Sequence, residues 1–133
     1  MKKMSMVMEM SRSDDPSSAM TPLYDSPSGF VPTEGASAFM LEDYEKAKAR
    51  GAKIYAEISG VGISGHSNLL GKTMRIAANG HSDKIDVINT AANSTSGDKI
   101  ELLAIDALPG NPVVTNTKSQ TGHGFHIGGA LEA

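Results

Sequence analysis

The amino-acid sequence predicts an α/β fold, and three observations indicate it. Short apolar runs recur along the chain, segments with helical charge patterns separate them, and glycine or proline clusters mark most of their ends. In order, the segments predict strand, helix, strand, short helix, strand, helix, strand and helix, which is the alternation typical of α/β domains. The 133 residues have room for one domain with one modest core.

The first part of the chain predicts a loop, a strand and a helix. Residues 11–29 are rich in Ser, Pro and Asp and therefore indicate a loop. Residues 29–40 alternate weakly and then become apolar, which favours a buried strand. Residues 41–50 predict a helix because acidic side chains come early and basic ones late, which matches the helix dipole, and Gly51 provides a stop.

The later segments alternate between strands and helices. Residues 52–59 place Ile54, Ala56 and Ile58 on one face and so predict a strand, and residues 60–65 form a glycine-rich loop. Beyond this loop the pattern predicts, in order, a short helix over 68–78, a strand over 84–89, a helix over 98–108, a strand over 112–116 and a helix of small residues over 122–133.

Composition excludes several classes of function. A net charge of −3 and a pI near 5.7 give no electrostatic case for nucleic acid. The absence of Cys rules out a disulfide scaffold, a zinc–thiolate site and a Cys nucleophile within this chain. No apolar run approaches the roughly 20 residues of a membrane span. We expect a cytoplasmic protein.

The first ten residues, MKKMSMVMEM, resemble a signal peptide only in their two Lys residues. Glu9 interrupts the apolar region, which is too short, and no small-residue cleavage site follows. We interpret this segment as an interior helix or strand of a larger fold.

The end of the chain carries its most specific pattern. Residues 118–133, KSQTGHGFHIGGALEA, contain a Lys, a Gly-His pair and a run of small residues that ends in Ala-Glu-Ala. This pattern resembles the C-terminal catalytic signature of β-ketoacyl synthases, the condensing enzymes of fatty-acid and polyketide synthesis. Further blocks resemble the same family in the same order: PLYD at 22–25, SGFV at 28–31, EGA at 34–36, the helix-to-strand stretch 41–57, IDVIN at 85–89 and the helix 98–105.

The resemblance implies a partial thiolase-like (ketosynthase) layered α-β-α architecture, of which this chain matches the middle and C-terminal portion only. It suggests a Met-rich segment and Ser/Pro loop over residues 1–28, followed by a partial ketosynthase-like domain over residues 29–133. Together with the apolar alternation, it predicts that Ile54–Ile58, Ile85–Ile88 and Val113–Thr115 are adjacent central strands.

Two departures from the family bear on activity. Family members are much longer, and the half with the nucleophilic Cys has no counterpart here. The motif His-Gly-Thr-Ser-Thr, which opens with the first catalytic His, corresponds here to Ala91-Ala92-Asn93-Ser94-Thr95, so Ala91 occupies the His position. Ala carries no proton. This substitution resembles the chain-length factors of polyketide systems, which are inactive homologues paired with an active subunit; a degenerate copy is the alternative.

The resemblance carries three site residues onto this chain: His123, Lys118 and Glu101. In the family, two His side chains contact the extender thioester, and the Lys organises the second His through a nearby Glu. We expect His123 at a helix N-terminus, which would favour its neutral form. Alternatively, Lys118 and His123 are a relic pair that satisfies only local hydrogen bonds.

The same resemblance implies the partners of the chain. They are acyl carrier protein and acyl thioesters, with either a Cys-bearing ketosynthase partner or a homodimer. Two interpretations stay open: a subunit that contributes structure or chain-length control, and an active condensing enzyme whose Cys lies on another polypeptide.

A competing hypothesis rests on residues 60–65. Gly60, Gly62 and Gly65 form a G-x-G-x-x-G pattern after a predicted strand, as in a small nucleotide-binding, Rossmann-like oxidoreductase module, and Asp83 lies at a suitable distance for a ribose. Against it, the residues that follow are a poor helix continuation. A phosphate-binding P-loop ending at residues 71–73 fails because His66 stands where that motif needs Gly.

We expect no cofactor for the ketosynthase-like chain and no metal ion. His126 follows His123 by three residues, a spacing that could share a metal on one helical face, but two ligands without a third fix no geometry.

Overall fold

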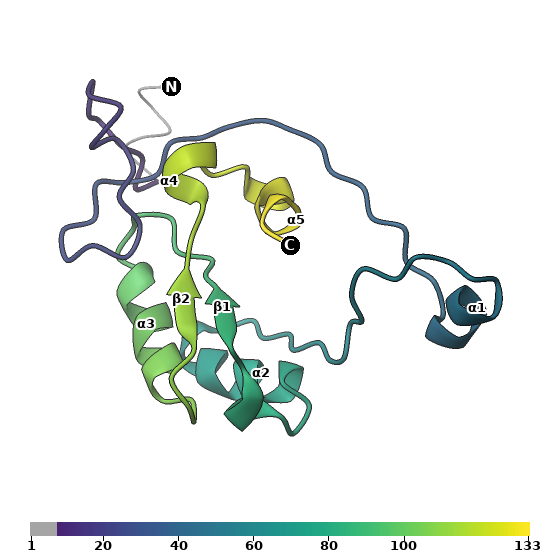
Figure 1. Cartoon of the computed structure of the whole chain (residues 1–133). Coiled ribbons are helices and arrows are strands. Elements are labelled where there is room, and N and C mark those ends of the chain that lie inside the picture. Colours follow the sequence, from purple (N-terminus) through teal and green to yellow (C-terminus); the bar gives the residue numbers. More distant parts are fainter. Residues whose placement is uncertain (1–7) are drawn as a thin grey trace.

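The computed structural model describes residues 8–133, which form a body and a projecting arm (Figure 1). We define the arm as residues 34–65, two extended segments with helix α1 between them. Within the described residues, the helices are α1 (Tyr44–Ala49), α2 (Leu70–Ala77), α3 (Asp98–Asp106), α4 (Lys118–Thr121) and α5 (Gly128–Leu131); the strands are β1 (Val87–Asn89) and β2 (Val113–Thr115); short 3-10 helices span Ser67–Leu69, Ser82–Lys84 and Phe125–Ile127.

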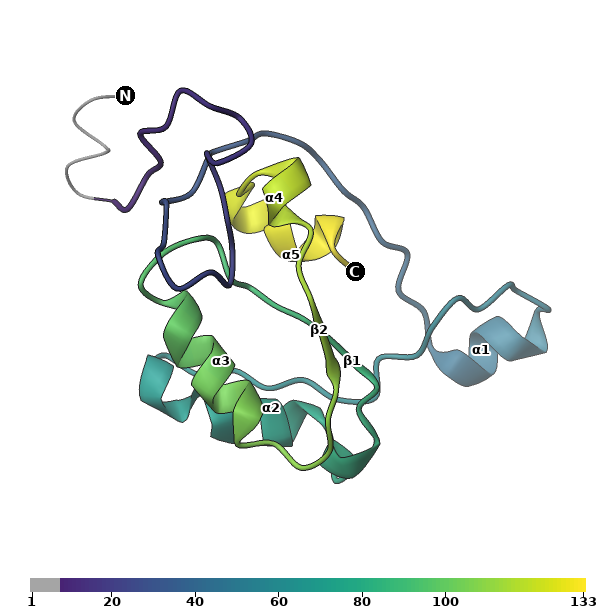
Figure 2. The same cartoon turned by 60° about the vertical axis from the view of Figure 1, so that its left-hand side comes forward.

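The body is organised around a parallel pair of strands joined through α3. Val87 of β1 lies opposite Val113 of β2, and Asn89 lies opposite Thr115. Helices α2 and α3 pack against each other, and α3 runs beside the strands while α2 lies across their lower end in the view of Figure 2. The predicted strands over 84–89 and 112–116 and the helix over 98–108 are confirmed in shorter form, as is the short helix over 68–78.

Helix α1 confirms the prediction for residues 41–50. The Asp43 side chain caps its N-terminus by accepting a hydrogen bond from the Lys46 amide at 3.1 Å. Gly51 ends it with a φ of 72°, a left-handed conformation that favours glycine. An ion pair between Arg50 and Glu42, at 2.6 Å, spans the helix, and both side chains are solvent-accessible. Local chemistry alone is sufficient to form this element.

The strands predicted over residues 29–40 and 52–59 are wrong as strands. Neither segment is assigned to a strand, and in the described part of the chain no backbone–backbone hydrogen bond involves residues 34–42 or 53–65. Among the described residues, the first segment forms two isolated bridges, from Phe30 to Met10 and from Pro32 to His123. Ile54–Ile58 therefore does not join the sheet, whereas the other two predicted central strands do lie side by side. The alternation of apolar and polar side chains indicates that a segment can form a strand, but a β-strand also needs a neighbouring strand for its backbone hydrogen bonds.

The predicted single helix over residues 122–133 is also wrong. Helix α4 ends before it, and a turn at Gly122 separates α4 from the 3-10 helix Phe125–Ile127 and from α5. Gly122 has a φ of 73°, and a Cβ there would lie 3.0 Å from the carbonyl oxygen of Val31. Because the chain passes so close to residue 31, it turns where the small-residue pattern suggested continuous helix.

The described residues bury few large side chains. Met20, Phe30, Ile105 and Leu108 supply most of the apolar core, and the most deeply buried side chains are the hydroxyls of Thr90 and Ser94. The interpretation of residues 1–10 as a helix or strand falls mainly on residues 1–7, which lie outside the described residues. Within the described chain, none of the helices has the length and apolar character needed to cross a membrane.

Candidate functional site

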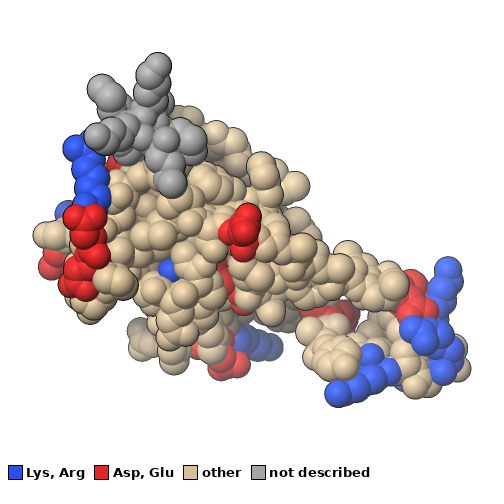
Figure 3. Space-filling view, turned by 90° about the horizontal axis from the view of Figure 1, so that it is seen from above, with Lys and Arg blue, Asp and Glu red and all other residues tan. Residues whose placement is uncertain are grey.

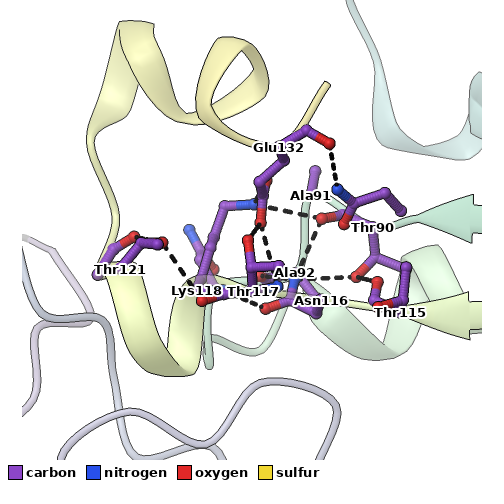
Figure 4. A network of polar contacts seen from close by, with 12 residues as sticks. Thr90, Ala91, Ala92, Thr115, Asn116, Thr117, Lys118, Thr121 and Glu132 are labelled. Carbon is purple, nitrogen blue, oxygen red and sulfur yellow. Dashed lines mark hydrogen bonds and ion pairs between the residues drawn. The ribbon is translucent and has the colours of Figure 1, made fainter. Parts of the chain in front are cut away.

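Lys118 is the centre of a buried polar network. It is the first residue of α4, and its side chain is only 4% exposed. The ammonium forms an ion pair with the carboxylate of Glu132 and donates a hydrogen bond to the Thr90 carbonyl oxygen at 3.2 Å (Figure 4). Two of the three ammonium donors therefore have partners, as a buried charge requires.

Glu132 is held from several sides. Its carboxylate also accepts a hydrogen bond from the Thr117 hydroxyl at 2.9 Å, and its backbone oxygen accepts one from the Asn89 side chain at 2.8 Å. Burial would raise the pKa of Glu132, but the hydrogen bonds from Lys118 and Thr117 and the charge of Lys118 outweigh it, so the pKa is lowered. The carboxylate is thus stabilised in its ionised form.

Asn116 fastens the start of α4 to the chain that follows β1. Its side-chain amide donates to the carbonyl oxygens of Thr90 at 3.1 Å and Ala92 at 2.8 Å, and its own oxygen accepts from the Lys118 amide at 2.9 Å (Figure 4). The Thr90 amide in turn donates to Thr115 at 3.0 Å, so the pairing of β1 and β2 extends up to the site. One side chain thereby fixes Lys118 relative to residues 90–92.

Glu101 does not pair with Lys118 directly. It is buried on α3, and one carboxylate oxygen accepts a hydrogen bond from the Ala91 amide at 2.8 Å. Burial raises the pKa of Glu101, although the Ala91 amide opposes the shift. Sequence reasoning expected Glu101 to be the acidic partner of Lys118; the partner is Glu132. The sequence did contain a signal for this, because Glu132 belongs to the Ala-Glu-Ala ending that carried the resemblance.

His123 lies in the turn between α4 and the next 3-10 helix, not at a helix N-terminus as the sequence suggested. Its amide donates to Val31 at 2.7 Å, and its carbonyl oxygen accepts from the Thr33 amide at 3.2 Å. The ring packs edge-on against Phe30, with 5.2 Å between centroids, and lies beside Phe125 at 5.0 Å. The backbone and the aromatic neighbours together fix the imidazole in place.

The environment of His123 favours the neutral imidazole. Burial lowers the pKa of His123, the charge of Lys118 lowers it further, and the charge of Glu132 opposes them. The Nδ1 atom is buried and has no hydrogen-bond partner within residues 8–133. A Cβ at Gly128 would lie 3.8 Å from Lys118 Cε and 3.9 Å from His123 Nδ1, so the two side chains converge on that glycine.

The position of Ala91 is tied to Glu101 and to Asp98. Asp98, at the start of α3, accepts hydrogen bonds from the amides of Asn93 at 2.9 Å and Ser94 at 2.8 Å. Together with the bond from Ala91 to Glu101, these contacts shape residues 91–94. The methyl group of Ala91 can donate neither a proton nor a hydrogen bond.

The glycine-rich loop has a packing role. A Cβ at Gly60 would lie 2.2 Å from the Ala77 carbonyl oxygen, and one at Gly62 would lie 2.2 Å from that of Thr73. These glycines therefore let the chain run against the side of α2, away from the helix N-terminus where a pyrophosphate would bind. This close approach explains Gly60 and Gly62, whereas a Cβ at Gly65 would meet no atom within 4 Å.

Residues 8–133 contain no group of three or more His, Cys, Asp or Glu side chains placed to hold a metal ion. His126 is exposed, whereas His123 is turned into the aromatic cluster.

Comparison with known proteins identifies the family of this chain. The chain is 38% identical to 3-oxoacyl-(acyl-carrier-protein) synthase 2 of Rhizobium meliloti over 90% of its length, and 35% identical to an actinorhodin polyketide β-ketoacyl synthase of Streptomyces coelicolor over 91%. By sequence, the chain belongs to the β-ketoacyl synthase family. A mitochondrial 3-oxoacyl-(acyl-carrier-protein) synthase of Arabidopsis thaliana is 38% identical over 79% of the chain.

The β-ketoacyl synthase match covers only part of each relative. The chain spans 32% of the Rhizobium meliloti protein, 30% of the Streptomyces coelicolor protein and 27% of the Arabidopsis thaliana protein. No protein-family model matches the chain. The relatives give no support to the nucleotide-binding alternative.

Proposed function

We propose that this chain supplies the Lys118–Glu132–His123 portion of a β-ketoacyl synthase active region to a polypeptide that carries the nucleophilic Cys, within fatty-acid or polyketide synthesis. The observation that carries the proposal is the His123 ring, fixed among aromatic side chains beside a buried Lys118–Glu132 pair. In this proposal the body is a part of a thiolase-like layered α-β-α domain, and acyl-carrier-protein thioesters are the substrates.

The reaction defines what these residues can do. In decarboxylative condensation, a Cys thiolate holds the acyl chain as a thioester, and the extender thioester loses CO2 to leave an enolate. The enolate carbon bonds to the acyl carbonyl carbon, and the Cys leaves as a thiolate. Hydrogen-bond donors aimed at the thioester oxygen stabilise the enolate. A neutral imidazole has one N–H to donate, and the lowered pKa of His123 keeps it in that form.

Lys118 is then a positioning residue. The structure gives it hydrogen bonds to Glu132 and Thr90 and none to His123. It acts on His123 through its positive charge, which disfavours the protonated ring, and through the packing of both side chains around Gly128. Glu132 supplies the counter-charge that makes a buried Lys118 tolerable.

We do not propose that this chain catalyses condensation by itself, for two reasons. The chain has no Cys, and Ala91 stands at the position of the first catalytic His. A homodimer of this chain would add no thiolate, so a Cys-bearing ketosynthase partner is the assembly that we propose. A chain-length-factor-like role, in which the partner supplies all of the chemistry, is the alternative to this proposal.

The test is a radiolabelled acyl-transfer and malonyl-decarboxylation assay, run on the chain alone and with a Cys-bearing ketosynthase polypeptide. The lone chain should take no label. In the assembled system, His123→Ala should lower activity by roughly 10²-fold, the scale for losing one donor to a developing oxyanion. His126→Ala, in the same segment but exposed, is the matched control and should leave activity unchanged.

Two outcomes would contradict the proposal. Covalent labelling of the lone chain would show that another side chain serves as nucleophile. Full activity of the His123→Ala assembly would reduce this chain to a structural role, the relic interpretation of the Lys118 and His123 pair.

A further inference from the structure

Helix α2 is followed by the dipeptide Asn79-Gly80. The Asn79 amide donates a hydrogen bond to the Ile76 carbonyl oxygen at 3.1 Å, and both residues of the pair have left-handed backbones, with φ values of 48° and 83°. Asn and Gly are the residues that most readily take this conformation at the end of a helix. The pair therefore stops the helix, and that role does not use the Asn79 side chain.

The Asn79 side chain holds the base of the arm. Its amide nitrogen donates a hydrogen bond to the Ser59 carbonyl oxygen at 3.0 Å. The next residue also packs closely here, because a Cβ at Gly60 would lie 3.2 Å from Asn79 Cβ. Farther out, the arm stands clear of the body, with charged side chains gathered around α1 (Figure 3). Asn79 is therefore placed to fix the arm where it leaves α2.

The same dipeptide is chemically labile. The side-chain amide of Asn can be attacked by the backbone nitrogen of the following residue, and Gly hinders this attack least because it has no Cβ. Among the Asn residues of the chain, Asn79 alone precedes Gly. Both residues are exposed, and the Gly80 amide forms no backbone–backbone hydrogen bond among the described residues. Water and base can therefore reach the reacting groups.

We propose that Asn79 is a site of spontaneous deamidation and that this reaction releases the base of the arm from α2. The Gly80 amide nitrogen loses its proton to base and bonds to Asn79 Cγ, while the Cγ–Nδ2 bond breaks and ammonia leaves. The five-membered succinimide then takes up water. Cleavage of its Cγ–N bond gives an aspartate at position 79, and cleavage of its other C–N bond gives an isoaspartyl linkage through Cγ.

Either product loses the contact with Ser59. A carboxylate has no N–H to donate, so two acceptors would face each other where a hydrogen bond had been. The isoaspartyl product also adds one carbon atom to the backbone of the turn that follows α2. Because Asn79 Nδ2 is the donor that holds the Ser59 carbonyl oxygen, residues 59–62 should come away from α2 after either reaction.

The hydrogen bond to Ser59 also governs the rate of the reaction. In the folded chain it holds the Asn79 amide group toward the arm, and the left-handed turn fixes the Gly80 nitrogen, so attack on Cγ requires local opening first. Loosening of the arm favours deamidation, and deamidation removes a contact that opposed loosening. The two steps reinforce each other, so the release of the arm is irreversible.

The first experiment measures the reaction by mass spectrometry of tryptic peptides, after the full chain has been kept at physiological temperature. Asn79 should deamidate at least about tenfold faster than the exposed Asn68, which precedes the bulkier Leu69. Asn111 is the control that cannot react by this route, because Pro112 has no N–H. The rate at Asn79 should rise with pH, and unfolding in urea should raise it by about tenfold.

The second experiment tests whether the arm controls this rate. A Cβ at Gly62 would lie 2.2 Å from the Thr73 carbonyl oxygen, so Gly62→Ala should push the arm from α2 and raise the deamidation rate at least about threefold. Gly65→Ala, where a Cβ meets no atom within 4 Å, is the matched control and should keep the natural rate. Circular dichroism checks that each variant is folded. If Gly62→Ala unfolds, the comparison with urea tests the same coupling in the natural chain.

The third experiment measures the position of the arm. Because the chain has no Cys, spin labels can be attached through Glu57→Cys in the arm and Gln120→Cys in the body, both at exposed positions. Asn79→Asp reproduces one product and should broaden the distribution of label-to-label distances at least about twofold. Asn68→Asp makes the same chemical change away from the Ser59 contact and should leave the distribution unchanged.

Three outcomes would overturn the inference. Equal rates at Asn79 and Asn68 would show that the dipeptide is not a modification site. Equal rates at Asn79 in the folded chain and in urea would show that the hydrogen bond to Ser59 does not control the reaction. An unchanged distance distribution in Asn79→Asp would show that deamidation does not release the arm.

Discussion

Among the described residues, the ion pair of Lys118 and Glu132 in the body and that of Arg50 and Glu42 in the arm have opposite surroundings. The Lys118 and Glu132 side chains are 4% and 7% exposed, whereas Arg50 and Glu42 are 61% and 30% exposed. The buried pair is supported by Thr90 and Thr117, while the arm pair stands in water. The comparison shows that this chain buries the ion pair of the body among other polar groups and leaves the ion pair of the arm exposed to solvent.

The largest expected effect comes from breaking the buried pair. Glu132→Gln leaves the Lys118 ammonium buried without a counter-charge, which costs about 3–5 kcal/mol of folding stability in comparable sites. In a chain with so small a core, circular dichroism should then show a largely unfolded population. Lys118→Met combined with Glu132→Leu replaces the pair with apolar groups and should recover part of the loss. Equal unfolding of the single and double variants would contradict the buried-pair explanation.

Adding a side chain at Gly62, where the chain passes close to α2, should lower the folding stability by less than breaking the buried ion pair. A Cβ at this position would overlap the Thr73 carbonyl oxygen at 2.2 Å, so Gly62→Ala must move the base of the arm away from α2, at a cost of about 1–3 kcal/mol. Gly65→Ala is the control, because a Cβ at Gly65 meets no atom within 4 Å. Urea unfolding of both variants measures the difference, and equal midpoints would argue against tight packing at Gly62.

The pH dependence of stability should report the burial of His123. Its pKa is lowered in the folded state, so between that value and the unfolded value of about 6.5 the unfolded chain binds more protons. The stability that it contributes is complete above about pH 6.5 and is lost as the pH falls through the folded pKa. The measurement is the difference in unfolding free energy between the natural chain and His123→Gln across this range. The exposed residue His126, changed to Gln, provides the matched control variant.

The smallest effect is expected in the arm. Glu42→Gln removes the carboxylate partner of Arg50, but both groups are solvated, and exposed pairs contribute little. The thermal unfolding midpoint should not change measurably. A clear loss of stability would mean that the arm depends on its own ion pair and would weaken the contrast with Lys118 and Glu132.

The sequence was sufficient wherever local chemistry decides structure. Helix α1 has its cap, charge order and glycine stop within a few residues, and β1, α3 and β2 follow one another as a compact unit. The sequence could not reveal that residues 53–59 pair with no strand among the described residues. Their alternation of apolar and polar side chains indicates that one face could be buried, but it does not identify the neighbouring strand. Pairing is decided by what lies beside a segment, and composition does not contain that information.

The sequence predicts which residues belong to the candidate site better than it predicts their contacts. Lys118 and His123 were identified from the ending of the chain, and the structure brings both to Gly128. The partner of Lys118 was assigned to Glu101, although Glu132 forms the ion pair. The neutral form of His123 was expected from a helix N-terminus, whereas burial and Lys118 produce it. Such contacts depend on turns like that at Gly122, which only the folded chain reveals.

The hydrogen bonds of Ser94 bear on how the chain would respond to proteolytic cleavage. Its hydroxyl is completely buried, accepts hydrogen bonds from the amides of Thr21 at 3.2 Å and Ser28 at 3.1 Å, and bonds the Ser28 hydroxyl at 2.8 Å. The basic residues of α1, by contrast, lie at the arm's tip, where trypsin has access. Cleavage there would divide the chain in two, but the N-terminal fragment would stay bound to the body through the hydrogen bonds at Ser94. The N-terminal part is therefore joined to the rest of the body by noncovalent contacts, those of the Ser94 hydroxyl among them, as well as by the peptide bonds of the arm.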